Sequence, residues 1–247
     1  MRFTRFVTLG LLAFLAACAT PPPVTDRDAM AEFNANNDPA EPFNRAVFAV
    51  NQGLDTVLLR PATVAYRTLV PSPARTGLRN ALRNIRTPVI LLNDMLQGQP
   101  QRAGNTLGRF VVNTTLGLGG LIDVADWYWG VPFHNEDFGQ TLASWGVGEG
   151  PYLVLPLLGP SNPRDTFGFA VDIATQPLTW VGQGFEVNLL SGLRTGLGLL
   201  DTREAVQDTL DEVNRTSLDP YATLRSGYRQ GRNAAIANRD RGGQPAR

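Results

Sequence analysis

The sequence predicts a mainly α-helical protein, a single domain of many short amphipathic helices. Apolar residues recur at helical spacing along most of the chain, and prolines stand where the spacing restarts. The best candidate for a strand, from Tyr152 to Leu158, contains Pro156, so we expect an extended crossing segment there. The 247 residues suffice for one domain of ordinary size or two small ones.

The first residues are typical of an export signal. Arg2 and Arg5 precede an apolar run from Phe6 to Phe14, and small residues come directly before Cys18. We assign residues 1–17 to a signal peptide and expect Cys18, the only cysteine, to be acylated as in bacterial lipoproteins. A plain signal peptide with Cys18 present by chance is the alternative.

The remaining chain divides into a tether, a helical body and a tail. Residues 18–37 carry three consecutive prolines and few large apolar groups, which indicates a solvated, partly extended tether. We expect the body to span residues 38–238 and residues 239–247 to be disordered. No stretch after the signal is long and apolar enough to cross a bilayer, so deeper membrane contact would need short amphipathic elements.

The body is expected to open with an amphipathic helix. Asp38 is the predicted N-cap. Phe43 and Val47 lie on the apolar face and are expected to hold the helix against the body, whereas Asn44 lies on an adjoining polar stripe. We expect this helix to end before Pro61.

Further helices are predicted where prolines follow. Pro73, Pro88 and Pro100 each precede apolar residues at helical intervals, and Ser72 and Thr87 are plausible N-caps for two of these segments. The later helices are expected to begin near Asn162-Pro163 and Pro177, to cover residues 188–213, and to begin again at Asp219-Pro220.

Composition argues against several chemistries. His134 is the only histidine, so the usual zinc ligands cannot be assembled, and we expect no metal and no cofactor. A serine hydrolase needs a base beside its nucleophile, and Ser144 lacks the preceding glycine of the G-x-S-x-G motif. We interpret Glu136 and Asp137 as a solvated turn and predict no catalytic residue. A formal charge of zero gives no indication of nucleic acid as a partner.

Glycines cluster in two short stretches. Neither stretch has the spacing of a nucleotide-binding loop, so we expect tight turns and close approach of backbones. The glycines are Gly117, Gly119 and Gly120 in the first stretch, and Gly146, Gly148 and Gly150 in the second.

Three large aromatic residues are consecutive: Trp127, Tyr128 and Trp129. They cannot all point inward from one face of a helix. Two locations are therefore possible for these residues. They lie at the membrane interface, with the rings at the level of the lipid head groups, or they are buried in the protein.

Several short motifs follow one another along the chain. No single motif identifies a protein family, but all of them together, in this order, do. They include Asp38-Pro39 through Glu41, Asn44-Arg45, Leu54-Asp55, Leu96-Gln97-Gly98, Asn113-Thr114-Thr115, Asp137 to Leu142, and Gly146 to Tyr152. Over residues 38–221 this set resembles the MlaA family, also called VacJ.

The resemblance implies both a fold and a function. It implies a ring of helices embedded in one leaflet of the outer membrane, on the periplasmic face, around an amphipathic channel. It also implies a lipid-anchored protein, not an enzyme, that removes mislocalised membrane phospholipids from the outer leaflet. Such a protein passes them to a soluble periplasmic lipid carrier and lies beside a porin trimer. On this basis we expect Phe43 and Asn44 to regulate the channel, and the two glycine stretches to shape its mouth.

Two other functions are weighed against transport. A periplasmic lipoprotein hydrolase would need a second histidine or a nucleophile elbow, and the sequence has neither. A structural lipoprotein that only scaffolds porins is poorly distinguished from a transporter by sequence. Lipid that co-purifies with the protein would distinguish these two.

Overall fold

The computed structural model describes residues 23, 25–26, 38–177 and 185–237. In chain order, the first elements are α3 (Glu41–Leu54), the π-helical turn η1 (Asp55–Leu59), α4 (Arg60–Leu69), α5 (Ser72–Leu96), α6 (Pro100–Thr115) and α7 (Val124–Trp129). They are followed by α8 (Phe138–Ser144), β1 (Leu153–Leu155), β2 (Gly159–Ser161), α9 (Pro163–Thr175), α11 (Phe185–Thr216) and α12 (Pro220–Ala237). The prediction of a mainly α-helical single domain is confirmed. The predicted signal peptide, Cys18 and nearly all of the tether, the helix at Pro177 and the tail lie outside the described residues.

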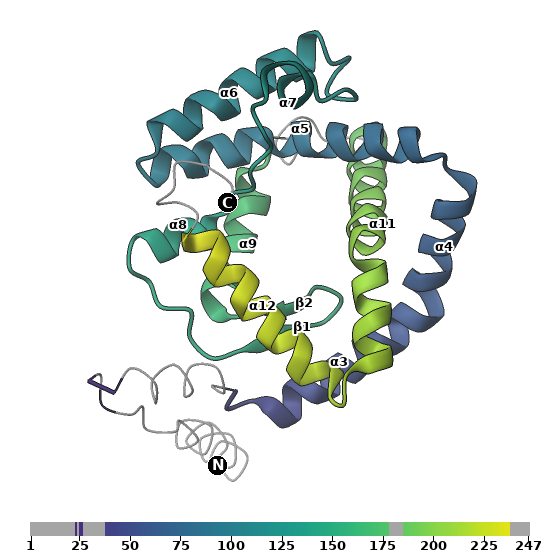
Figure 1. Cartoon of the computed structure of the whole chain (residues 1–247), viewed down its shortest axis with the longest axis vertical. Coiled ribbons are helices and arrows are strands. Elements are labelled where there is room, and N and C mark those ends of the chain that lie inside the picture. The colour runs from purple at the N-terminus through teal and green to yellow at the C-terminus, as the bar shows by residue number, and fades with distance from the viewer. Residues whose placement is uncertain (1–22, 24, 27–37, 178–184, 238–247) are drawn as a thin grey trace.

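The helices follow one another around a ring (Figure 1). α5 and α4 make two sides of the ring, and α3 leads from α4 toward the β-hairpin and α12. α6 packs along α5, and α8 packs on α9. α11 runs beside α4 and touches α5, so one long helix braces two sides of the ring.

The first helix continues through Pro61 into α4, so the prediction that it ends before this proline is wrong. In a regular α-helix the proline ring would meet the carbonyl group four residues earlier. Here the chain widens into the π-helical turn η1 just before Pro61, and the Arg60 N–H bonds to the Asp55 carbonyl. The wider turn explains how the helix tolerates the proline.

The helix α5 likewise contains Pro88, which was predicted to open a new segment. Thr87 is therefore no N-cap, and its hydroxyl donates to the Arg83 carbonyl one turn earlier. Val89 and Ile90 are each 1% exposed, and their packing offsets the hydrogen bond that Pro88 removes. Ser72 is the first residue of α5 and makes no side-chain cap.

Two later helix starts follow local capping rules. The Asn162 side chain accepts from the Asp165 N–H at 2.8 Å and caps α9. The Asp219 carboxylate accepts from the Ala222 N–H at 3.2 Å at the start of α12. Both helices begin where the sequence predicts them.

The segment from Tyr152 to Leu158 forms part of a β-hairpin rather than a single extended crossing. β1 and β2 pair antiparallel, with Leu153 opposite Ser161 and Leu155 opposite Gly159. Pro156 lies in the turn, where it removes no ladder hydrogen bond, and so the proline does not prevent pairing.

The interior of the described chain is more polar than apolar. A small apolar cluster of Tyr152, Val154 and Tyr221 joins the hairpin to α12, and Val47 and Phe48 of α3 pack on it. Most other buried side chains in these residues are polar or charged, whereas large apolar side chains are exposed along α3, α4, α6, α7 and α9. This distribution reverses the usual arrangement of a water-soluble domain.

Candidate functional site

Asn44 joins the first helix to the hairpin. Its side-chain N–H₂ donates to the Tyr152 carbonyl at 2.9 Å and to Asp38 at 2.7 Å, and its carbonyl accepts from the Val154 N–H at 2.9 Å. Asn44 is 0% exposed, whereas Phe43 is 60% exposed. The expectation that Phe43 holds the helix against the body is therefore wrong, whereas Val47 does pack on the buried cluster, beside the inward-facing Asn44.

Asn51 repeats this arrangement two helical turns later. Its side chain donates to the Leu155 carbonyl and accepts from the Leu157 N–H, both at 2.9 Å. Residues seven apart lie on the same face of a helix. The two asparagines therefore attach α3 to the backbone of the hairpin.

Asp38 is also not the predicted N-cap, since α3 begins after Ala40 without a side-chain cap. Its buried carboxylate accepts from Asn44, from the Tyr221 hydroxyl, and from Arg225 at 3.0 Å. Burial and the bond to Asp38 raise the pKa of Tyr221 above its usual range. The first residue of the predicted body, directly after the predicted tether, is thus fastened to the C-terminal helix α12.

The first glycine stretch forms the turn after α6. Gly119 and Gly120 have φ of 73° and 97°, and a β-carbon on Gly120 would collide with the Asn84 side chain of α5. A β-carbon on Gly117 would collide with the Ile122 and Asn113 carbonyl oxygens. These three positions require glycine, as the sequence predicts for a tight turn.

The second glycine stretch is only partly of this kind. Gly146 and Gly150 have φ of 86° and 73°, and Gly150 lies against Pro163. Gly148 has no positive φ and no heavy atom within 4 Å of a β-carbon there. The expectation that Gly148 needs the conformational freedom of glycine is wrong.

The three consecutive aromatics are all exposed. Trp127, Tyr128 and Trp129 are 82%, 77% and 54% exposed on the short helix α7. Asp123 caps this helix, and its carboxylate also accepts from Arg109 at 2.6 Å. The aromatic rings thus project from a helix that is fixed firmly to α6.

Glu136 is not part of a solvated turn. It is 1% exposed, accepts from Arg102 at 2.5 Å and from Gln97 at 2.8 Å, and burial raises its pKa despite these partners. Asp137 caps α8 and pairs with Arg232 at 2.6 Å. Although burial opposes this, Arg232 lowers the pKa of Asp137 to about 2.

His134 belongs to the same polar layer between α5, α6 and the α7–α8 loop. Its Nε2 lies 3.1 Å from the Asp94 carboxylate and 3.2 Å from the Thr106 hydroxyl, which itself donates to Asp94. A catalytic triad needs the acid and the nucleophile on opposite nitrogens of the imidazole. Here the same nitrogen, Nε2, contacts both the Asp94 carboxylate and the Thr106 hydroxyl, so the arrangement is not that of a triad. His134 instead anchors the loop in which the sequence predicts it to lie.

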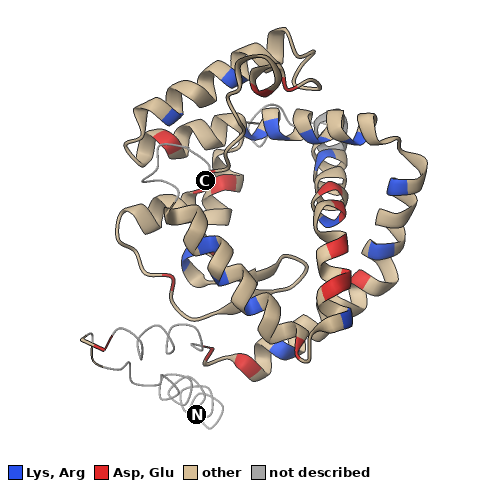
Figure 2. Ribbon diagram, viewed as in Figure 1, with Lys and Arg blue, Asp and Glu red and all other residues tan. Residues whose placement is uncertain are grey.

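Ion pairs bind α11 to the α3–α5 side of the ring. Acidic residues along α11 lie beside basic residues of α4 and α5 (Figure 2). Arg79 bonds Asp201 at 3.0 Å and Glu204 at 2.7 Å. The other pairs are Arg60 with Asp211, Arg67 with Glu204 and Asp208, Arg75 with Glu204, and Arg203 with Asp55.

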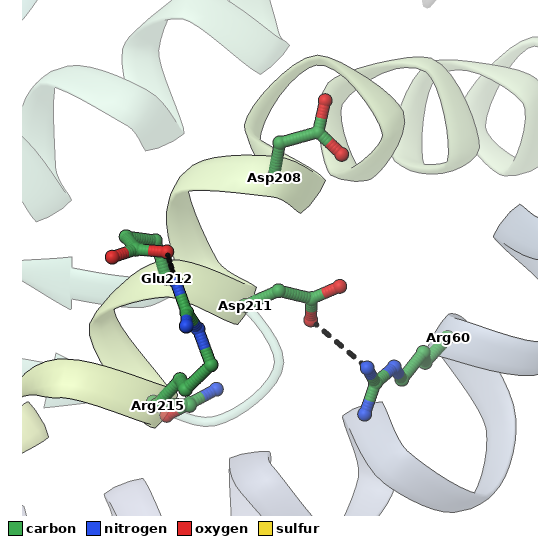
Figure 3. Close-up of a pocket in the computed structure, with 6 residues that line it drawn as sticks. Arg60, Asp208, Asp211, Glu212 and Arg215 are labelled. Carbon is green, nitrogen blue, oxygen red and sulfur yellow. Dashed lines mark hydrogen bonds and ion pairs between the residues drawn. The ribbon is translucent and has the colours of Figure 1, made fainter.

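Two cavities adjoin α11. The first, of about 500 Å³, is lined by polar and charged side chains, and the Arg60–Asp211 pair of 3.3 Å spans it (Figure 3). The second, of about 570 Å³, is apolar, and its volume is within the range of ligand pockets. It is lined by Leu59, Gly192, Leu193, Gly196, Leu197, Leu199 and Leu200.

Within the described residues, no group of acidic, histidine or cysteine side chains could hold a metal ion. In that same part of the chain, no helix is both long and apolar enough to cross a bilayer.

Sequence reasoning missed several buried contacts. Arg102 and Glu136 are 34 residues apart, and no local pattern pairs them. In contrast, Asn44 and Asn51 carry a readable signal, namely two amides at a spacing of two helical turns.

The contact between α8 and α9 depends on two further glycines, Gly139 and Gly168. They bring the two backbones into contact, and a β-carbon on Gly168 would collide with Gly139.

Comparison with known proteins gives consistent matches. The family model described as MlaA lipoprotein matches residues 36–235. The intermembrane phospholipid transport system lipoprotein MlaA of Escherichia coli is 39% identical over 207 residues, which cover 82% of this chain and 79% of that protein. The Haemophilus influenzae protein of the same name is 33% identical over 222 residues, 89% of this chain and 87% of that one.

A solved structure has a similar fold. It comes from work on the structural basis for maintenance of bacterial outer membrane lipid asymmetry. It matches with a TM-score of 0.70 and 36% identity, over 81% of this chain and 98% of that one.

Proposed function

The chain belongs to the MlaA lipoprotein family, and we propose that it removes mislocalised phospholipids from the outer leaflet of the outer membrane and passes them to a soluble periplasmic carrier. Relatives are named for intermembrane phospholipid transport, and the structural neighbour comes from work on outer-membrane lipid asymmetry. In this role the protein maintains lipid asymmetry by transport and not by an enzymatic reaction.

The reversed distribution of side chains carries this proposal. Along α3, η1 and α4 the exposed apolar residues run from Phe43 through Val57 to Leu69, while Asn44 and Thr63 are fully buried. An apolar exterior of this extent needs a partner other than water. The acyl chains of one leaflet supply such a partner for a ring that does not cross the bilayer.

Acylation of Cys18 would add a permanent anchor on the periplasmic face. A buried acyl chain contributes about 0.8 kcal/mol per methylene, so two or three chains hold a protein on the membrane without a spanning helix. The rings of Trp127, Tyr128 and Trp129 would then lie at head-group depth, where amphipathic aromatics are enriched.

The ring would surround the lipid path. In this proposal the glycine turns at 117–120 and 146–150 shape its mouth, and Asn44 controls it because α3 is fastened to both the hairpin and α12. Phe43 would contribute from the lipid-facing side of α3, since its side chain is exposed.

The partners in this proposal are membrane phospholipids, a porin trimer and a periplasmic carrier. The porin would lie against the apolar exterior, and the carrier would receive lipid on the periplasmic face. Affinity purification of the tagged protein from cross-linked outer membranes tests the porin contact.

One experiment tests the function directly. The protein is purified in mild detergent, its bound phospholipid is quantified by mass spectrometry, and transfer to a purified carrier is followed. In cells that lack the protein, a membrane-impermeant amine reagent should label more phosphatidylethanolamine at the surface. Unchanged surface labelling together with no co-purified lipid would refute transport and favour a purely structural role.

A further inference from the structure

Two arginines lie at the junction of α5, α9 and α11. Most arginines of the described chain lie in ion pairs, but Arg83, Arg86 and Arg194 do not, and of these three Arg83 is exposed. The side chains of Arg86 and Arg194 are half-buried. An unpaired, partly desolvated guanidinium group is costly, so two at one junction call for an explanation.

Gln176 fixes the geometry of this junction. It is the C-cap of α9. Its side-chain N–H₂ donates to the carbonyl of Ile85, the residue before Arg86, at 3.4 Å, and its side-chain oxygen accepts from Arg194 at 3.0 Å. One amide therefore connects the backbone beside Arg86 with the guanidinium of Arg194. Three helices therefore meet at Gln176, with residue 86 of α5 next to the backbone that Gln176 contacts and the Arg194 guanidinium on the other side of the same amide.

The two arginines act on each other electrostatically. Burial lowers the pKa of Arg194, and the positive charge of Arg86 lowers it further. The charge of Arg86 also acts on Asp172, and this carboxylate already accepts hydrogen bonds from Asn93 at 3.2 Å and from the Phe138 N–H at 3.1 Å. Asp172 lies within 4 Å of neither guanidinium and therefore does not neutralise the pair by direct contact.

We propose that Arg86 and Arg194 together form an anion site for the phosphate group of a phospholipid. Two guanidinium forks match phosphate oxygens, and a bound anion would relieve the repulsion between them. The Gln176 amide positions Arg194 and holds α9 beside the site. This inference rests on the proposed lipid transport and assigns to it a contact for the head group.

The test uses the full acylated protein in dodecyl maltoside micelles with a phosphatidylglycerol that carries a fluorescent acyl chain. Arg86→Gln/Arg194→Gln should weaken binding at least about 10-fold, since a hydrogen bond to a charged group is worth about 1.5–3 kcal/mol. Arg86→Lys/Arg194→Lys, which keeps both charges, should retain most of the affinity. Arg83→Gln is the matched control, because Arg83 is an exposed arginine one turn earlier on α5 that lies over the Phe133 ring.

Competitors identify the source of the phosphate. Unlabelled phosphatidic acid should displace the probe, whereas diacylglycerol with the same chains should not. Displacement by millimolar inorganic phosphate as effective as by phosphatidic acid would show a site for free phosphate and overturn the head-group assignment. Displacement by diacylglycerol equal to that by phosphatidic acid would overturn the site as well.

Stability separates binding from structure. In lipid-free protein that carries Asp172→Asn, where the attraction between Arg86 and Asp172 is absent, Arg86→Gln should raise the melting temperature, because it relieves the repulsion between the two arginines. A clear fall would show that Arg86 has a structural role and would overturn the site. If wild type binds the probe and the double Gln variant binds it equally, the site is wrong while transport stands. If wild type binds no phospholipid at all, the proposed function itself fails.

Discussion

Replacement of Asn44 by alanine should destabilise the fold strongly. The substitution removes three buried hydrogen bonds, to Asp38, to the Tyr152 carbonyl and from the Val154 N–H. Tyr152 and Val154 are 2% and 3% exposed, so water cannot replace the lost partner. Each orphaned buried group costs about 1–3 kcal/mol and the lost Asp38 bond about 1 kcal/mol more, so the two backbone groups and this bond together give about 3–7 kcal/mol.

Thermal unfolding of the purified protein in detergent measures this effect. For a chain of this size, each kcal/mol shifts the midpoint by about 2–4 °C, so Asn44→Ala should lower it by about 6–28 °C. Asn51→Ala is the matched comparison, since Asn51 makes two similar bonds to the hairpin at partly exposed positions. We expect a smaller loss there, because water can reach the freed groups.

Phe43→Ala provides the opposite extreme. Because this ring is largely exposed, its loss should change the stability by no more than about 0.5 kcal/mol, the usual range for surface positions. A larger destabilisation by Phe43→Ala than by Asn44→Ala would refute the inward orientation of the polar stripe of α3.

Four further predictions follow from other parts of the chain. Cys18→Ser should abolish labelling with radioactive palmitate, and a labelled variant would contradict the lipid anchor. Gly120→Val should destabilise the α6 turn, whereas Gly148→Val should leave the melting temperature nearly unchanged; equal losses would contradict the difference in backbone φ. Burial raises the pKa of Asp172 to about 6, so the folded protein binds a proton that the unfolded chain releases between about pH 4 and 6. The free energy of unfolding should therefore decrease by up to about 3 kcal/mol as the pH rises from about 4 to about 6. Asp172→Asn should make the free energy of unfolding less dependent on pH in this range. Alanine in place of Trp127, Tyr128 and Trp129 should reduce binding of a non-acylated variant to vesicles without altering its fold by circular dichroism.

The parts of the fold that depend on neighbouring residues were predictable from the sequence. Asn162 and Asp219 cap helices because each side chain needs only an N–H three residues away. Pro61 and Pro88 could not be judged in this way, because tertiary packing and a π-helical turn decide whether a helix continues through a proline. The Arg102–Glu136 pair was equally out of reach, since contacts across 34 residues leave no periodic signal.

The reversal at α3 has a more general cause. A pattern of apolar and polar residues identifies the two faces of a helix, but it does not state which face is buried. That choice rests on an assumption about the medium outside, and in water the apolar face turns inward. In this chain the inward faces carry amides and ion pairs, such as Asn44 with the hairpin and Arg79 with α11, around one small apolar cluster. Water weakens such hydrogen bonds and ion pairs, because it offers the same groups other partners. A ring whose apolar exterior lies among acyl chains keeps water away from most of them. In the membrane setting that we propose, the polar interior and the apolar exterior are two consequences of one cause: hydrogen bonds determine the shape, and the lipid determines which side faces out.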